Sequence, residues 1–264
     1  MKNIKYSIII PSNKMDSYLV KAINSVLDDV VQEDAVEVVL VVNGCNKDNI
    51  SDKLKRIYTD VEKIIITKSN AMEISTALNE GIESSCGNIL IRFDSDDIWV
   101  KGRFNEIVSS VQSSKSEFIF GTSLYDIIDS EGQFSRHGRP PLDKDKFIKR
   151  PFKSFTAHPA IFFSRTLFEL VRYKPEYAGI EDVLFMHEIL SLDCVNLMVI
   201  DKPLINYRIH EEQYTSVNKN NQKIRLAKYF HNNLFFYEKV ILYIINKKIF
   251  TKGFTQALIL SLKL

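Results

Sequence analysis

The sequence predicts an α/β protein built on a mostly parallel central sheet with flanking helices. Across the first hundred residues, short runs of apolar, β-branched residues alternate with segments of helical periodicity. This alternation requires strands that run in the same direction and are joined by right-handed crossovers. The chain has 264 residues, enough for one large domain with an appendage. Its composition, 45% hydrophobic and 26% charged, is that of a folded soluble protein.

The individual elements follow from the positions of these patterns. Pro11 ends the first apolar run, and Asp16 or Ser17 is the expected cap of the first helix. In the first half we expect strands at 6–11, 36–42, 63–67 and 88–93, and helices at 18–27, 48–58 and 74–84. In the second half we expect strands at 117–121, 160–164, 195–200 and 203–210, the last at a sheet edge, and helices at 104–111, 166–171 and 182–192. A turn at 129–132 should join two hairpin strands, and residues 136–154 should form a long surface loop.

Three carboxylates, Asp94, Asp96 and Asp97, follow the strand at 88–93. Parallel sheets bind ligands beyond the carboxyl ends of their strands, so these side chains lie where a ligand is expected. Carboxylates this close repel one another unless they meet water, cations or a metal, and a hard divalent ion that leaves sites for phosphate oxygens suits them best. The alternative is a solvated acidic turn that caps the next helix. For Asp97, support of the ligand site and helix capping are equally good interpretations.

The charge of the chain is unevenly distributed. The formal net charge is +2, but residues 218–264 contain nine Lys or Arg and a single acid, Glu238, for a balance of +8. The first 217 residues therefore carry −6. We interpret the chain as a mildly acidic body, 1–217, followed by a basic amphipathic helical tail, 218–264. The tail either lies on anionic lipid or packs on the body or a second subunit, which leaves oligomerisation open.

Cysteine use and the chain start suggest a cytoplasmic protein. The three cysteines lack the spacing of a zinc or redox site, so we expect reduced thiols buried as small residues; they are Cys45, Cys86 and Cys194. The first apolar run is too short for a signal-peptide core, and no apolar stretch approaches the ~20 residues that span a bilayer. No nucleic-acid partner is expected.

A series of short motifs resembles the family 2 glycosyltransferases of the glycosyltransferase-A fold. The resemblance covers roughly residues 5–216 and implies an inverting enzyme with a nucleotide-sugar donor. It depends on the order of the motifs on a matching pattern of strands and helices. In chain order, the motifs are Ser7-Ile8-Ile9-Ile10-Pro11-Ser12, Val41-Val42-Asn43-Gly44, residues 70–82, Arg92-Phe93-Asp94-Ser95-Asp96-Asp97, His158-Pro159-Ala160, Glu181-Asp182 and Tyr207-Arg208-Ile209-His210.

The resemblance implies a role for each matching residue. Asp96 ligates Mg²⁺ or Mn²⁺, Asp94 faces the ribose or the metal, and His210 lies at the metal or at a phosphate. Asp182 is the general base for the acceptor hydroxyl, and Glu181 orients the acceptor or Asp182. Donor contacts are assigned to Pro11, Ser12, Asn13, Asn43, Asn70, Asn79, Arg92, Asp94 and Arg208. His158 is expected to hydrogen-bond its own loop. The body divides into a nucleotide-binding half, about 1–100, and an acceptor half, 101–217.

The chain departs from the family pattern at two positions of the donor site. Val42 stands where the family commonly has an Asp that contacts uracil, so Asn43 or backbone groups must replace that contact. Asn13-Lys14 replaces a common Tyr-Asn pair. These changes weaken the inference about the base of the donor, although UDP is the expected nucleotide.

The expected function is therefore metal-dependent, inverting transfer of a hexose to a hydroxyl of a glycan or lipid-linked glycan, in the synthesis of bacterial surface polysaccharide. The expected place is the cytoplasm, with peripheral contact to the membrane through the tail. One alternative is an inactive nucleotide-sugar-binding homologue, which Val42 leaves open. Another is a sugar nucleotidyltransferase, but residues 11–14 lack the glycine-rich phosphate loop that such an enzyme needs.

Overall fold

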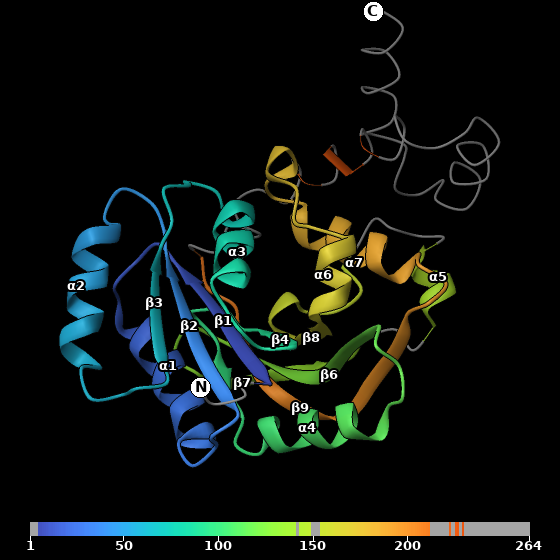
Figure 1. The fold of residues 1–264 in the computed structure, drawn as a ribbon, viewed down its shortest axis with the longest axis horizontal. Helices are drawn as coiled ribbons and strands as arrows, with labels where there is room; N and C mark the ends of the chain where they lie inside the picture. Colours follow the sequence, from blue (N-terminus) through green and yellow to red (C-terminus); the bar gives the residue numbers. More distant parts are fainter. Residues whose placement is uncertain are drawn as a thin grey trace, which may run out of the picture.

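The first half of the protein is a parallel sheet with helical crossovers (Figure 1). The computed structural model describes residues 5–140, 143–148 and 154–211, together with residues 222, 225, 226 and 229. The parallel strands are β1 (Tyr6–Ser12), β2 (Val36–Val42), β3 (Ile64–Lys68) and β4 (Ile89–Arg92). They are connected by the helices α1 (Ser17–Val30), α2 (Lys47–Ile57) and α3 (Ile74–Glu83). The Asp16 carboxylate accepts a hydrogen bond from the Leu19 amide (2.9 Å) and caps α1, as predicted.

The second half extends the same sheet with strands of both directions. These strands are β5 (Ile98–Trp99), β6 (Ile119–Ile128), β7 (Phe134–Gly138), β8 (Ile161–Ser164) and β9 (Asn196–Arg208). The helical elements are α4 (Arg103–Ser113), α5 (Lys144–Ile148), η1 (His158–Ala160), α6 (Arg165–Leu170), η2 (Pro175–Tyr177) and α7 (Glu181–Leu190). Within the described residues the sheet has nine strands in the order β3-β2-β1-β4-β8-β6-β9-β5, with β7 paired to β6. The single α/β domain of the prediction is confirmed.

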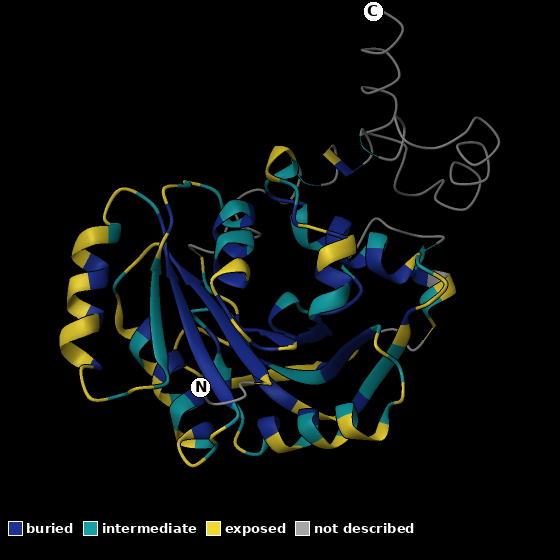
Figure 2. Cartoon of the chain, viewed as in Figure 1, coloured by how far each residue is buried: buried dark blue, intermediate teal, exposed yellow. Residues whose placement is uncertain are grey.

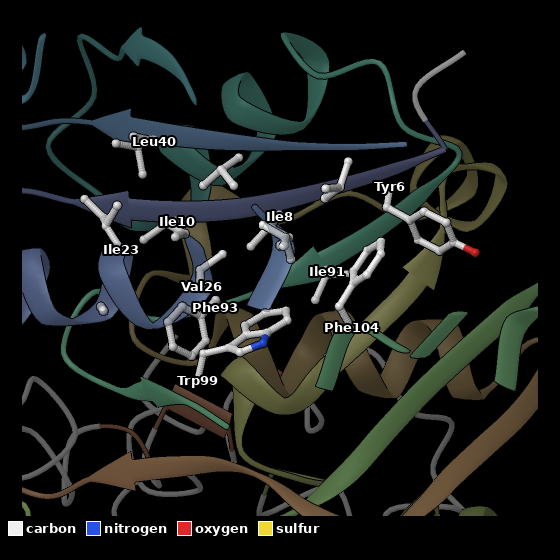
Figure 3. Packing of buried hydrophobic residues seen from close by; sticks show 14 of the residues in the cluster. Tyr6, Ile8, Ile10, Ile23, Val26, Leu40, Ile91, Phe93, Trp99 and Phe104 are labelled. Carbon is white, nitrogen blue, oxygen red and sulfur yellow. The ribbon is translucent and has the colours of Figure 1, made fainter. Parts of the chain in front are cut away.

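Alternation along the strands builds a hydrophobic core on each face of the sheet. Ile8 and Ile10 of β1 face the layer that contains α1, α2 and α4, whereas Ile9 faces the layer that contains α3, α6 and α7. Figure 3 shows the first layer, where Ile8 and Ile10 lie near the rings of Phe93 and Trp99. The exposed residues lie on the outer surfaces of helices such as α2 and α4 (Figure 2). The core thus fixes the strand ends that carry the polar motifs.

Three local predictions were wrong. Residues 195–200 and 203–210 belong to one strand, β9, because the irregular register near Pro203 is absorbed without breaking the pairing with β6. This strand is internal, between β6 and β5. Pro11 lies inside β1 rather than after it. Its ring needs no hydrogen bond there, since β4 pairs with β1 only as far as Ile9 opposite Arg92.

The cysteines differ from expectation. All three are unpaired, as predicted, but they are exposed rather than buried. In the described part of the chain, no helix is long and apolar enough to cross a membrane. The expected loop at 136–154 is wrong in part, because the end of β7 and the whole of α5 lie within it. Residues 141–142, 149–153 and all but four residues of the tail at 218–264 lie outside the description.

Four residues of the tail are described, and three of them contact the region of α7. Leu226 is 4% exposed and packs with Ile180, Val183 and Leu184. The Tyr229 hydroxyl donates a hydrogen bond to Glu188 (2.7 Å), and Arg225 donates one to the Ala178 carbonyl. This part of the tail therefore packs on the body, which was one of the two predicted arrangements.

Candidate active site

The carboxyl ends of β1, β2 and β3 meet at one edge of the sheet. The Asn43 amide donates to the Ser12 carbonyl (3.1 Å), and the Gly44 amide donates to the Ala71 carbonyl (3.2 Å). Gly44 has φ +82°, a left-handed conformation that suits glycine at this turn. These bonds bring together the predicted donor contacts Ser12, Asn13, Asn43 and Asn70, whose segments follow three different strands; Asn13 and Asn70 are exposed.

Val42 does not contribute a side chain to this edge. It is 1% exposed and packs in the core layer that includes α1. The next residue, Asn43, is also buried, and its side-chain nitrogen Nδ2 donates a hydrogen bond to the Met72 carbonyl (3.5 Å). The loop after β3 is therefore tied to the turn after β2, and the exposed residues here include Asn13, Asn70 and Met72.

The three carboxylates after β4 form a compact cluster. Asp94, Asp96 and Asp97 each offer an oxygen, and these atoms lie within 4.8 Å of one another. Burial raises the pKa of Asp94, and it raises the pKa of Asp97 well above the usual value, with the neighbouring carboxylates adding to both effects. One oxygen of Asp97 is buried without a hydrogen-bond partner among the described residues. An oxygen-rich, negatively charged cluster with an unpaired oxygen fits Mg²⁺ or Mn²⁺.

The end of β9 closes over this cluster. His210 Nε2 lies 3.0 Å from Asp96 Oδ2, so imidazole and carboxylate could bind one cation together. The Arg208 amide donates to Asp97 (2.7 Å), and its guanidinium donates to the carbonyls of Asp96 (2.8 Å) and Ser130 (2.9 Å). Arg208 is buried at 3% exposure, so the structure gives it a bracing role beneath the cluster. Asp97 is part of this brace and does not cap a helix, because α4 begins only at Arg103.

A carboxylate that the sequence analysis did not select supports the cluster from α1. Asp29 accepts hydrogen bonds from Trp99 Nε1 (2.8 Å), the Gly102 amide (2.6 Å) and the Phe104 amide (3.0 Å). It thereby holds the segment between the acidic motif and α4. The sequence indicates a special role for Asp29 only through its position, which is unfavourable for a carboxylate. Asp28 and Asp29 lie near the carboxyl end of a helix, where the dipole disfavours negative charge.

A second unpredicted residue, Arg103, is buried under the same segment. Its side chain is 0% exposed, and its guanidinium carbon lies 4.1 Å from the centre of the Trp99 ring. Nη2 donates to the Pro159 carbonyl (2.7 Å), which links α4 to η1. Burial lowers the pKa of Arg103 to about 9. No pattern in the sequence distinguishes this arginine from a surface one.

Arg92 lies at the centre of the site. It is 2% exposed and donates hydrogen bonds to the Phe93 carbonyl and to Asp94. Its charge also lowers the pKa of Asp182 and of Glu181. Arg92 is the cation that holds Asp94 in place and offsets part of the negative charge of the site.

The predicted base, Asp182, lies in the first turn of α7. One of its oxygens accepts a hydrogen bond from the Ser154 hydroxyl (2.7 Å). Burial raises the pKa of Asp182, whereas the Ser154 hydrogen bond lowers it. Burial and the adjacent Asp182 raise the pKa of Glu181 to about 7, and Glu181 accepts a hydrogen bond from the Gly179 amide. Glu181 thus contacts the backbone that leads into α7.

Asn79 and His158 both form hydrogen bonds to Tyr173, which packs against α7. The Asn79 amide nitrogen donates to the Tyr173 carbonyl (2.8 Å), and its oxygen accepts from the Tyr173 amide (3.2 Å). His158 Nε2 lies 2.8 Å from the Tyr173 hydroxyl, and the Tyr173 ring stacks on Phe185 of α7 with centres 4.0 Å apart. Burial lowers the pKa of His158 well below its usual value, so the imidazole is neutral. Asn79 and His158 therefore position α7 through Tyr173.

Comparison with known proteins identifies the family. Residues 7–171 match the model of Glycosyl transferase family 2. The chain belongs to glycosyltransferase family 2. The match includes the acidic cluster and the donor edge, whereas Asp182 and His210 lie beyond it. Membership in this family favours glycosyl transfer over the nucleotidyltransferase alternative.

Several proteins resemble this family 2 member over most of its length. It is 28% identical over 230 residues to the O-antigen biosynthesis glycosyltransferase WbnJ of Escherichia coli, with 84% of each chain covered. It is 21% identical over 232 residues to the minor teichoic acid biosynthesis protein GgaB of Bacillus subtilis, covering 83% of this chain and 25% of that protein. It also matches an uncharacterized glycosyltransferase of Rickettsia bellii, of which it covers 34%. The chain therefore spans about a third of the Rickettsia protein and a quarter of GgaB.

The fold has solved counterparts. Residues 1–349 of TarS from S. aureus superpose with a TM-score of 0.66 at 15% identity, covering 96% of this chain and 73% of that one. The same TarS fragment in complex with UDP-GlcNAc gives a TM-score of 0.66 at 16% identity. The likeness confirms the predicted glycosyltransferase-A fold of this family 2 glycosyltransferase.

Proposed function

We propose that this glycosyltransferase transfers a hexose, with inversion, from a UDP-sugar to a hydroxyl of a glycan or lipid-linked glycan. The setting is the synthesis of a bacterial surface polysaccharide in the cytoplasm. The names of two relatives support this setting, since WbnJ is named as a glycosyltransferase of O-antigen biosynthesis and GgaB as a protein of minor teichoic acid biosynthesis. The complex of TarS with UDP-GlcNAc supports a UDP-sugar as donor.

The observation that carries the proposal is the approach of Asp182 to the acidic cluster. The negative charge of Asp182 raises the pKa of Asp94, although 87 residues separate the two in the chain. We therefore place the sugar of a donor whose diphosphate is held at the cluster near Asp182. This placement would let Asp182 act on an acceptor hydroxyl that attacks the anomeric carbon from the face opposite the diphosphate.

Asp182 is the proposed general base. It accepts the proton of the acceptor hydroxyl while that oxygen bonds to the anomeric carbon, and the bond from this carbon to the diphosphate oxygen breaks. The nucleoside diphosphate leaves with the bonding electron pair. Burial raises the pKa of Asp182, which makes its carboxylate a stronger base than an exposed one. Ser154 orients this carboxylate, and Glu181 fixes the backbone before it.

The donor would lie across the edge where β1, β2 and β3 end. Exposed Asn13 and Asn70, together with Ser12 and Asn43, supply polar groups for ribose and base. Asp96, Asp94 and His210 would hold Mg²⁺ or Mn²⁺, and this cation, when bound, offsets the charge that develops on the departing diphosphate. Arg92 adds a fixed positive charge behind the cluster.

The body and the tail have separate proposed roles. Residues 1–217 form the catalytic domain, with the donor bound by about 1–100 and the acceptor by 101–217. In the tail, 218–264, Leu226 packs on α7. The formal net charge of the tail, +8, suits peripheral contact with an anionic lipid surface that carries the acceptor.

Donor binding is tested by thermal unfolding of the full chain with UDP, with and without Mn²⁺, because a ligand of the folded state raises the melting temperature. The wild-type protein should show a shift with UDP that requires Mn²⁺. Asp96→Asn should abolish this shift. Asp201→Asn, which changes a carboxylate that is 76% exposed on β9, should retain it. Failure of UDP to shift the wild-type protein would contradict the proposed donor class.

Catalysis is tested by transfer from UDP-sugars to glycan acceptors, with the anomer of the product read by NMR. Asp182→Asn should bind UDP normally but lose at least about a hundredfold in rate, as expected for loss of a general base. An unchanged rate would exclude Asp182 as the base. Binding of UDP without transfer or hydrolysis of any UDP-sugar would instead favour the inactive homologue.

A further inference from the structure

Tyr18 lies in the first turn of α1, the helix that follows the donor edge at β1. Asp16 caps this helix by accepting a hydrogen bond from the Leu19 amide (2.9 Å), so the position of Tyr18 at the helix start is fixed. The Tyr18 hydroxyl donates a hydrogen bond to the Ser130 carbonyl (3.2 Å), in the turn between β6 and β7. The side chain therefore reaches from α1 to the β6–β7 hairpin.

Arg208 holds the Tyr18 ring as well. Its guanidinium carbon lies 4.7 Å from the centre of this ring, within the range of a cation–π contact. Arg208 Nη1 also donates to the Ser130 carbonyl (2.9 Å), the same oxygen that accepts the hydrogen bond of the Tyr18 hydroxyl. Because Arg208 is 3% exposed and bonds further to the Asp96 carbonyl, the ring packs on a group that is itself fixed.

The same ring contacts His210. The two ring centres lie 5.5 Å apart at an angle of 34°, a spacing typical of packed aromatic pairs. His210 follows the end of β9 by two residues, and its Nε2 lies 3.0 Å from Asp96 Oδ2. Of the residues that the structure describes, only Tyr18 has a ring contact with His210. The Tyr18 ring and the Asp96 carboxylate together therefore set the direction of the imidazole.

We propose that Tyr18 is a positioning residue for the cation site: its ring holds the His210 imidazole against Asp96, so that the two can bind one Mg²⁺ or Mn²⁺. This inference rests on the proposed function, because it takes Asp96 and His210 as ligands of that cation. A ligand that is oriented beforehand loses less side-chain freedom when the cation binds. Groups that orient metal ligands contribute about ten- to a hundredfold to metal affinity. Tyr18 acts through His210, since its own hydroxyl is directed to Ser130.

The test measures binding of Mn²⁺ to the full chain, alone and with UDP, from the EPR signal of the free ion. Tyr18→Leu removes the ring and should weaken Mn²⁺ binding about tenfold, the low end of the range for groups that orient a metal ligand. Tyr18→Phe keeps the ring and loses only an exposed hydrogen bond, so its Mn²⁺ affinity should stay within about twofold of the wild type. The matched control is Tyr58→Leu, at a buried tyrosine whose hydroxyl bonds to Asn24 of α1 (3.0 Å). It should leave Mn²⁺ affinity unchanged even though it lowers stability.

A double-mutant cycle with His210→Ala separates positioning from a general structural role. His210→Ala removes the proposed ligand and should weaken Mn²⁺ binding at least as much as Tyr18→Leu does. Adding Tyr18→Leu to this variant should cost less than about twofold more, because the ring no longer has an imidazole to hold. If Tyr18 only stabilised the fold, its tenfold loss would recur in the double variant.

The outcomes separate this inference from the proposed cation site. Three results would overturn the inference alone: wild-type Mn²⁺ affinity in Tyr18→Leu, the same loss from Tyr18→Leu with and without His210, or equal losses in Tyr18→Phe and Tyr18→Leu. Wild-type affinity in His210→Ala would remove His210 from the site and overturn the inference with it. Absence of Mn²⁺ binding by the wild-type protein, with and without UDP, would overturn the proposed cation site itself.

Discussion

The contacts of Asp29 make a direct prediction about how the acidic cluster is held. Asp29→Ala removes the acceptor of three hydrogen bonds, from Trp99 Nε1 and from the amides of Gly102 and Phe104. Trp99 and Phe104 are 3% and 2% exposed, so water cannot easily replace the lost carboxylate at these two donors. Gly102 is half-buried, and water can compensate there in part.

The expected cost follows from these donors. An unsatisfied buried donor costs about 1–3 kcal/mol, so two of them with a partial contribution from the third give a loss of about 3 kcal/mol in the free energy of unfolding. For a domain of this size, this corresponds to a fall of about 6–12 °C in melting temperature. The Trp99 ring, which lies on the Arg103 guanidinium, would also lose its anchor. Binding of UDP in Mn²⁺ should therefore weaken as well.

The assay is denaturant unfolding, followed by thermal shift with UDP and Mn²⁺. Asp28→Ala is the matched control, because this neighbouring carboxylate is exposed and lies in the same last turns of α1. Removing either charge relieves the same unfavourable interaction with the helix dipole, so the difference between the variants reports the hydrogen bonds. Equal stability of Asp29→Ala and Asp28→Ala would refute the reasoning.

Two further predictions concern α7. Ser154→Ala removes a hydrogen bond that lowers the pKa of Asp182, so this pKa should rise. Because the base must be deprotonated to act, the transfer rate of the variant should begin to fall at a higher pH than that of the wild type when the solution is acidified. An unchanged pH–rate profile would show that Ser154 does not act on the base. Leu226→Ala should lower the free energy of unfolding by about 2–3 kcal/mol, since Leu226 is 4% exposed against α7. Leu170→Ala, at a leucine that is 58% exposed, should have little effect, and equal losses in both would contradict the packing of the tail.

The donor edge and the acidic motif could be predicted because they are local features. Apolar runs and helical periodicity place β1, β2 and β4, and the positions that follow each strand carry Ser12, Asn43 and Asp94. The carboxyl ends of parallel strands meet at one edge whatever the side chains elsewhere do. Asp182 was found by the resemblance of a two-residue motif, and its place at the start of α7 agrees with that resemblance.

The errors occurred where pairing between distant strands decides the outcome. Pro203 suggests a break between two strands, but pairing with β6 on one side and β5 on the other keeps β9 continuous. Arg208 looked like a ligand for phosphate. Its guanidinium instead donates to the carbonyls of Asp96 and Ser130, which lie 112 and 78 residues away in the chain, and no local pattern indicates these bonds.

The sequence by itself determined the α/β class, the parallel first half, the family and the carboxylates at the strand end, because each depends on composition, periodicity or a short motif. Only the tertiary structure decided which groups hold those carboxylates and which remain available to a ligand. Asp29 accepts a hydrogen bond from Trp99, and Arg208 donates one to Asp97, although 70 and 111 residues separate the members of these pairs in the chain. Contacts between residues so distant in the chain depend on how the layers pack together. This packing is set by all the core residues at once rather than by any one segment.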